Sequence, residues 1–241
     1  MKKRILLSVI VLAVLVLASL VFFRRPAFRY SGVAEAVEVN ISSRLNDTIE
    51  AVLVEEGSPV QKGQTVVRLQ CEEVTLKHHI SQTEFNRAAQ LLKTTAGSRE
   101  NYDLKKNAYD HAALQKSWCE LISPLDGKVL YKYYEPGEFI AAGKKMLTVA
   151  DLHELDVWVY VPYAELANLS VGQEVKGYLP EADKTFFGHI TAINEASEFT
   201  PKNVQTREER TRLVYGVKTR VANDEHLTVK PGMTLEMEFV K

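Results

Sequence analysis

The sequence is poor in the residues that mark reactive or metal-binding sites. It has two cysteines, Cys71 and Cys119, which do not form a CxxC pair, so a zinc site built on them is not expected. The formal net charge of -1 provides no global positive field for nucleic acid. No G-x-S-x-G, H-E-x-x-H or Walker A pattern is present. We therefore expect a protein that is not an enzyme and that carries no cofactor or metal.

Long hydrophobic runs are missing except at the N-terminus. Residues 5–23 carry no charge and follow the basic cluster Lys2, Lys3 and Arg4. At a rise of about 1.5 Å per residue, such a helix just crosses a hydrocarbon core of about 30 Å. A cleaved signal peptide is the alternative, but its apolar region is shorter, so we expect residues 1–27 to form an uncleaved membrane anchor. The basic cluster predicts a cytoplasmic N-terminus with the rest of the chain outside; Arg24, Arg25 and Arg29 oppose this orientation.

An internal repeat is the most informative feature of the sequence. Residues 43–49 match residues 123–129, and residues 56–63 match residues 136–143, at a constant offset of 80 without a gap. Repeats are examined early because they fix the architecture of a protein. The offset pairs four glycines at places where the chain must turn, since glycine reaches positive φ at little cost. These are Gly57 with Gly137 and Gly63 with Gly143.

Each copy of the repeat reads as half of a β-sandwich. Ile49, Val52 and Val54 are strand-like, and the matched pairs Val67/Leu147 and Leu69/Val149 are apolar. Neither half can bury its apolar face alone, so the two halves are expected to pack against each other.

The repeated glycine and apolar pattern resembles the biotinyl/lipoyl domain. Carriers of that fold join their halves by a tight hairpin that presents the modified lysine, whereas here about fifty residues, 70–120, separate the halves. This arrangement resembles the HlyD-like membrane fusion proteins, or periplasmic adaptors, whose lipoyl domain is split by a helical hairpin. Because no lysine lies on a short connecting turn, the resemblance does not extend to covalent lipoate or biotin.

The inserted segment reads as two helices. Residues 72–93 contain no Gly or Pro, residues 94–98 form a turn, and residues 100–118 return. A narrow, partly polar seam at alternating three- and four-residue spacing would join the helices. On the first helix it comprises Cys71, Val74, His78, Ser81, Phe85, Ala88 and Leu92.

Cys71 and Cys119 flank the hairpin and would face each other at its base. In an oxidising periplasm a disulfide is favoured by this placement, and two unpaired thiols are the alternative.

The chain after residue 151 predicts several short strands and one short helix that starts at Pro162, which is typical of a small β-barrel. The predicted fold is therefore mainly β with an α-helical hairpin. Its parts are an N-terminal membrane anchor (1–27), a split lipoyl-like β-sandwich (28–70 and 120–151), a helical hairpin (71–119) and a small antiparallel β-barrel (152–241).

The hairpin tip carries Arg87, Leu91 and Ser98. Their spacing resembles the Arg-x3-Leu-x6-Ser motif with which adaptors of the family engage an outer-membrane duct. Arg87 and Leu91 share a helix face through their i,i+4 spacing, and Ser98 lies in the turn. The alternative interpretation is an ordinary solvated helix end.

The resemblance implies a periplasmic adaptor subunit of an inner-membrane efflux or secretion transporter, with an ABC-type partner favoured. Its copies would form a ring, by family analogy a hexamer, that leads to an outer-membrane duct. The single-pass anchor would hold it in the inner membrane, with most of the chain in the periplasm and no contact with nucleic acid. An accessory subunit that touches no duct is the closest alternative, and a biotin or lipoate carrier subunit is a more distant one.

Overall fold

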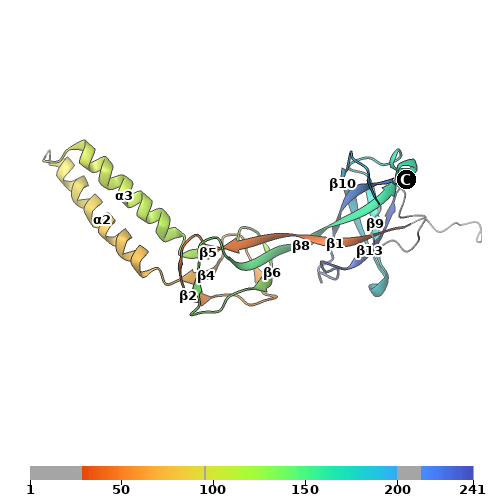
Figure 1. Cartoon of the computed structure of the whole chain (residues 1–241), viewed down its shortest axis with the longest axis horizontal. Coiled ribbons are helices and arrows are strands. Elements are labelled where there is room, and N and C mark those ends of the chain that lie inside the picture. The colour runs from red at the N-terminus through yellow and green to blue at the C-terminus, as the bar shows by residue number, and fades with distance from the viewer. Residues whose placement is uncertain (1–28, 95, 200–212, 241) are drawn as a thin grey trace, which may run out of the picture. The chain divides into compact units, whose positions relative to one another are not determined.

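The structure is a computed structural model that describes residues 29–94, 96–199 and 213–240. The expected membrane anchor lies outside these residues. Among the residues described, no helix combines the length and the apolar character needed to span a membrane. The described chain divides into two compact units, one built around Ala34–Asp156 and the other around Val157–Arg220 (Figure 1).

The strands of the first unit repeat with the offset that the sequence predicts. Three strands in each half correspond residue for residue at a distance of 80. They are β2 (Asp47–Val52) with β6 (Gly127–Lys132), β3 (Pro59–Val60) with β7 (Phe139–Ile140), and β4 (Thr65–Leu69) with the start of β8 (Lys145–Pro162). The ends of β1 (Tyr30–Ser42) and β5 (Glu120–Ile122) also correspond. The repeat is therefore a duplication of structure as well as of sequence.

Hydrogen bonds exchange between the two halves in matching pairs. The backbone N–H of Gly57 donates to the carbonyl of Val129 at 2.8 Å, and that of Gly137 donates to the carbonyl of Ile49 at 2.8 Å. Both glycines have positive φ, 82° and 89°, which explains why glycine is needed at each turn. Each half thus satisfies backbone groups of the other.

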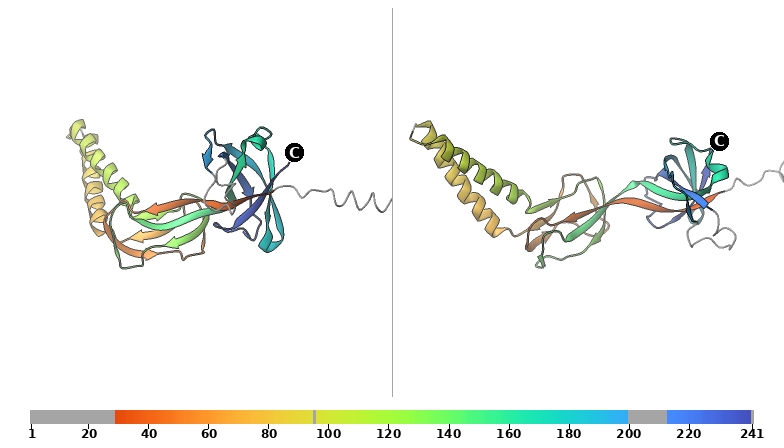
Figure 2. Two further views of the ribbon diagram at one scale, coloured as in Figure 1. Left: turned by 45° about the vertical axis from the view of Figure 1, so that its right-hand side comes forward. Right: turned by 45° about the horizontal axis from the view of Figure 1, so that its top comes forward.

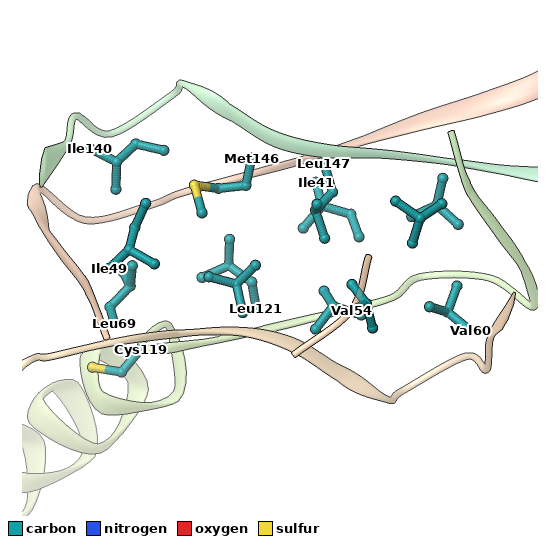
Figure 3. Packing of buried hydrophobic residues seen from close by; sticks show 14 of the residues in the cluster. Ile41, Ile49, Val54, Val60, Leu69, Cys119, Leu121, Ile140, Met146 and Leu147 are labelled. Carbon is teal, nitrogen blue, oxygen red and sulfur yellow. The ribbon is translucent and has the colours of Figure 1, made fainter. Parts of the chain in front are cut away.

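The sandwich core is filled by the same repeated positions from both sides. Ile49 and Val129 are both 1% exposed, and Val67 and Leu147 are fully buried. Figure 3 shows Ile49, Leu69, Ile140 and Leu147 pointing into the space between the layers. Burying each such side chain contributes about 1.5–3 kcal/mol, so neither half retains its core without its partner.

The segment between the halves forms the predicted pair of antiparallel helices. α2 spans Glu72–Lys93 and α3 spans Arg99–Ser117. They lie side by side in all views (Figure 1, Figure 2). The helix bounds agree with the sequence prediction within a residue or two, because Gly and Pro stand only outside the helices.

The second unit is a closed six-stranded barrel. Its strand order is β12-β10-β9-β13-β1-β8, and a β12–β8 pairing closes it. The strands contributed after residue 162 are β9 (Glu174–Leu179), β10 (Lys184–Ile193), β12 (Leu213–Ala222) and β13 (Thr234–Phe239). A one-turn helix α4 (Tyr163–Leu166), a short η1 (Pro180–Ala182) and the two-residue β11 (Glu198–Phe199) accompany them.

The barrel begins earlier in the chain than the sequence analysis expected. Tyr30–Val33, assigned there to the sandwich, pair with β13, where Tyr30 lies opposite Met237 and Val33 opposite Thr234. The reason is the length of β1 and β8, with 13 and 18 residues. Each strand runs without interruption through both units, so no loop marks the boundary between them.

Candidate functional site

The hairpin is held together by the seam that the sequence predicts. The ring of Phe85 stacks on that of Tyr109 with centroids 5.4 Å apart and lies 5.5 Å from that of Tyr102. Small residues bring the helices close: Ala88 and Ala112 are buried. The remaining predicted seam positions Val74, His78, Ser81 and Leu92 are buried or half-buried. The hairpin therefore has a thin apolar contact with most of its surface in solvent.

Charged pairs flank this seam. Lys105 Nζ donates to Glu84 Oε2 at 2.8 Å across the hairpin, and this hydrogen bond lowers the pKa of Glu84. Lys77 Nζ donates to Gln115 Oε1 at 3.3 Å. Such exposed contacts contribute little to stability, but they show which residues of α2 and α3 lie at the same height.

The three predicted docking residues at the tip differ in their structural roles. Arg87 and Leu91 are exposed on α2. Ser98 is the N-cap of α3, and its Oγ accepts a hydrogen bond from the backbone N–H of Asn101 at 3.1 Å. The sequence analysis missed this capping role, which is common for a serine just before a helix. Because the cap uses the Ser98 hydroxyl only as an acceptor, the hydroxyl proton can be donated to another group.

The turn before Ser98 is closed on Leu91. The Leu91 carbonyl accepts hydrogen bonds from the backbone N–H groups of Ala96 and Gly97, both at 3.1 Å. A Cβ at Gly97 would lie 3.0 Å from the Cβ of Leu91, so the turn passes directly over that residue. Leu91 is thereby held at the tip, next to the turn that leads to Ser98.

The hairpin base is closed by a disulfide. Cys71 and Cys119 are bonded, with Cα atoms 6.0 Å apart, and both lie in the sandwich core. Cys71 has a φ of 52°, in the left-handed region that non-glycine residues seldom adopt. The carboxylate of Asp47 accepts its backbone N–H at 3.1 Å, and Leu69 donates to the Cys119 carbonyl at 2.9 Å. The start of α2 is thus fixed by a covalent bond and by hydrogen bonds.

A groove of about 1130 Å³ lies at this base, between the ends of the helices and the sandwich. The guanidinium of Arg44 lies over the ring of Trp118 at 5.8 Å, and both line the groove. Leu114 and Ile122, each 53% exposed, add apolar surface, and Arg68 adds a second guanidinium. No motif in the sequence marks this groove, because its walls come from segments that are far apart in the chain.

A sandwich interrupted by a helical hairpin and followed by a barrel defines the class of membrane fusion proteins. A family model described as "CzcB-like, barrel-sandwich hybrid domain" matches residues 36–151. A "UPF0194 membrane protein" of Citrobacter koseri is 34% identical over 120 residues, which cover 49% of this chain and 36% of the relative. The chain thus matches little more than a third of that relative's length.

Solved structures share the fold at low sequence identity. A MacA-MexA chimeric protein that contains the Pseudomonas aeruginosa MexA α-hairpin domain aligns with a TM-score of 0.69 at 16% identity, over 89% of this chain and 81% of the other. The membrane fusion protein Spr0693 of Streptococcus pneumoniae R6 aligns with a TM-score of 0.61 at 21% identity, over 89% and 99%. Residues 36–151 are a CzcB-like barrel-sandwich hybrid domain, and the described chain shares the fold of these solved membrane fusion structures.

Proposed function

We propose that the protein is the periplasmic adaptor subunit of an inner-membrane efflux or secretion transporter, with an ABC-type transporter favoured. In this proposal its copies form a ring, and the hairpin tips meet an outer-membrane duct through Arg87, Leu91 and Ser98. The observation that carries the proposal is the replacement of the short turn of a carrier domain by the hairpin α2–α3. A carrier needs a flexible lysine at that turn, whereas an adaptor needs a projecting arm.

The disulfide supports a periplasmic location for the hairpin. Stable disulfides form in oxidising compartments and are rare in the bacterial cytosol. Cys71 and Cys119 are 1% and 7% exposed, so the bond is buried in the core and has a structural role. A hairpin outside the cytoplasm agrees with an N-terminal anchor in the inner membrane.

The tip supports direct docking, since Leu91 is 41% exposed and the Ser98 hydroxyl retains a proton to donate. An accessory subunit that contacts no duct is the second candidate. The shortness of the arm favours it, because helices of 22 and 19 residues reach only about 30 Å at a rise of about 1.5 Å per residue.

Photo-crosslinking from the tip separates the two candidates. A photoreactive residue at Ala96, which is exposed in the tip turn, is expected to label an outer-membrane protein in intact cells. The same residue at exposed Asn107, midway along α3, is the control. If Ala96 labels no outer-membrane protein while a transporter co-purifies with the chain in detergent, the accessory role is favoured. Failure of any transporter to co-purify would contradict both candidates.

A charge reversal tests the docking residues themselves. Arg87→Glu is expected to abolish labelling from Ala96, because the proposed contact of the guanidinium with the duct becomes a repulsion. Lys93→Glu makes the same charge change six residues away, and the helical repeat turns that residue to the other side of α2. Equal loss of labelling in both variants would show that charge alone matters and would remove the specific role of Arg87.

A further inference from the structure

The two outer edges of the hairpin base are exposed and differ in character. On α2, Leu76 is 60% exposed, and Glu73 and Ile80 beside it are also exposed. At about 100° per residue these three side chains lie away from the seam of Val74, His78 and Ser81. We call Glu73, Leu76 and Ile80 the α2 edge. It combines two apolar side chains with one carboxylate.

The opposite edge carries the groove. Leu114 points away from the seam on α3, and the groove continues from it to Trp118, Arg44 and Ile122. Ala113 and Thr75, which line the same groove, lie on the side of the seam opposite to Ile80 by the same helical spacing. The α2 edge and the groove therefore face away from each other on one hairpin.

The two surfaces lie at nearly the same height along the hairpin. The hydrogen bond between Lys77 and Gln115 shows the register of α2 against α3. Leu76 lies one residue nearer the base than Lys77, and Leu114 lies one residue nearer the tip than Gln115, so the two leucines differ in height by about 3 Å at a rise of about 1.5 Å per residue. Because the helices are antiparallel, Glu73 lies at the level of Trp118, where the guanidinium of Arg44 covers the indole.

Nearly equal height on opposite edges is the geometry of a head-to-tail contact in a closed ring. In a cyclic assembly every copy stands at the same level, and one surface of each copy meets a different surface of the next. The charges match as well, since Glu73 would reach Arg44 while Leu76 covers Leu114. Neither Glu73 nor Arg44 takes part in an ion pair among the residues that the structure describes.

From these relations we infer that the α2 edge of one copy binds the groove of a second copy of this chain, with Glu73 against Arg44 and Leu76 against Leu114 and Trp118. This inference rests on the ring in the proposed function and assigns the surfaces that build it. The contact is heterologous, so each copy uses both surfaces and the interface can repeat until the ring closes.

Photo-crosslinking in the full chain, purified in detergent, tests the contact. Benzoylphenylalanine at Leu76 is expected to give an intermolecular adduct that maps to residues 107–128 of another copy. Mixed heavy and light copies identify the adduct as intermolecular. The same probe at Leu104, which is 64% exposed at a different height, is expected to give none in that segment. An adduct at any other segment, or with any other protein, overturns the inference.

A charge swap gives a second test that does not depend on the probe. Glu73→Arg and Arg44→Glu should each lower the yield of the Leu76 adduct by up to about fivefold, as expected for an exposed ion pair turned repulsive. The double variant should restore it. Both residues are exposed, so the fold is not at risk. Singles without effect, or a double variant without recovery, overturn the pairing.

The failure of the inference and the failure of the proposed function give different results. If the chain forms oligomers in detergent but crosslinks at another segment, the inferred interface is wrong and the proposed adaptor role stands. If the chain stays monomeric, both alone and with a co-purified transporter, the inferred interface and the proposed ring are both wrong.

Discussion

Cys71 and Cys119 close the base of the hairpin, and their Cα atoms stand 6.0 Å apart although 48 residues separate them in the chain. The bond joins the residue before α2 to the second residue after α3 and lies inside the apolar core. The two ends of the arm are therefore covalently joined to each other inside the sandwich core.

Removal of this bond is expected to destabilise the first unit strongly. In the chain-entropy model, a closed loop of this length stabilises the folded state by about 4 kcal/mol. Cys71→Ser with Cys119→Ser should lower the free energy of unfolding by that order in denaturant titrations that follow Trp118 fluorescence in a Trp158→Phe background. The wild-type chain in reducing buffer is the control and should behave like the double variant. An unchanged transition would show that the bond contributes nothing.

Gly137 lies at a repeated turn and Gly127 lies at a close contact. Replacing them by alanine is expected to lower the free energy of unfolding by different amounts. Gly137 has a φ of 89° and open space around it, so Gly137→Ala should cost about 1–2 kcal/mol through backbone strain alone. Gly127 has no such φ, but a Cβ there would collide with the carbonyl oxygen of Ala150, so Gly127→Ala should cost about 3 kcal/mol. Equilibrium unfolding of the two variants measures the difference.

Asparagine separates the two causes, because it tolerates the left-handed region better than alanine and is larger. Gly137→Asn should be milder than Gly137→Ala. Gly127→Asn should be at least as harmful as Gly127→Ala. The reverse order at either position would contradict the assigned cause.

Tyr30 predicts a loss of barrel stability at alkaline pH. Its burial first, and then its hydrogen bond to the Glu165 carboxylate, raise the pKa of the phenol in the folded state. The folded protein therefore holds this proton more tightly than the unfolded chain. The resulting stability is fully present below about pH 10, the ordinary value for tyrosine, and is lost as the pH rises above it.

The measurement is the free energy of unfolding between pH 9 and 11, followed by Trp158 fluorescence in a Trp118→Phe background. Tyr30→Phe should cost about 1 kcal/mol at neutral pH and should flatten the alkaline decline. A decline of the same slope in Tyr30→Phe would assign the pH dependence to other groups.

The thin seam of the hairpin predicts local rather than global destabilisation on loss of its aromatic contacts. Phe85→Ala removes the stack on Tyr109 and the contact with Tyr102 and should cost about 2 kcal/mol. Hydrogen exchange should quicken in α2 and α3 while the sandwich strands keep their protection. Leu104→Ala, at an exposed position of α3, should change the exchange little; a similar acceleration there would show that the seam has no special role.

Much of the first unit follows from the sequence because its signals are local. The glycines at 57, 63, 137 and 143 mark turns that have positive φ in the structure, and the constant offset of 80 predicts which strands correspond. The absence of Gly and Pro from residues 72–93 predicts a helix that the structure contains as α2. Each of these signals needs only neighbouring residues or a direct comparison of two segments.

Tertiary structure alone decided how β1 and β8 are shared between the two units and where the groove lies. The alternation of Leu155 to Val161 indicates a strand, but nothing in it shows that β8 began at Lys145 or that Tyr30–Val33 would pair with β13. The groove joins Arg44 to Trp118 across more than seventy residues of chain. Strand pairing and groove walls depend on which distant surfaces are buried together, and local periodicity does not contain that information.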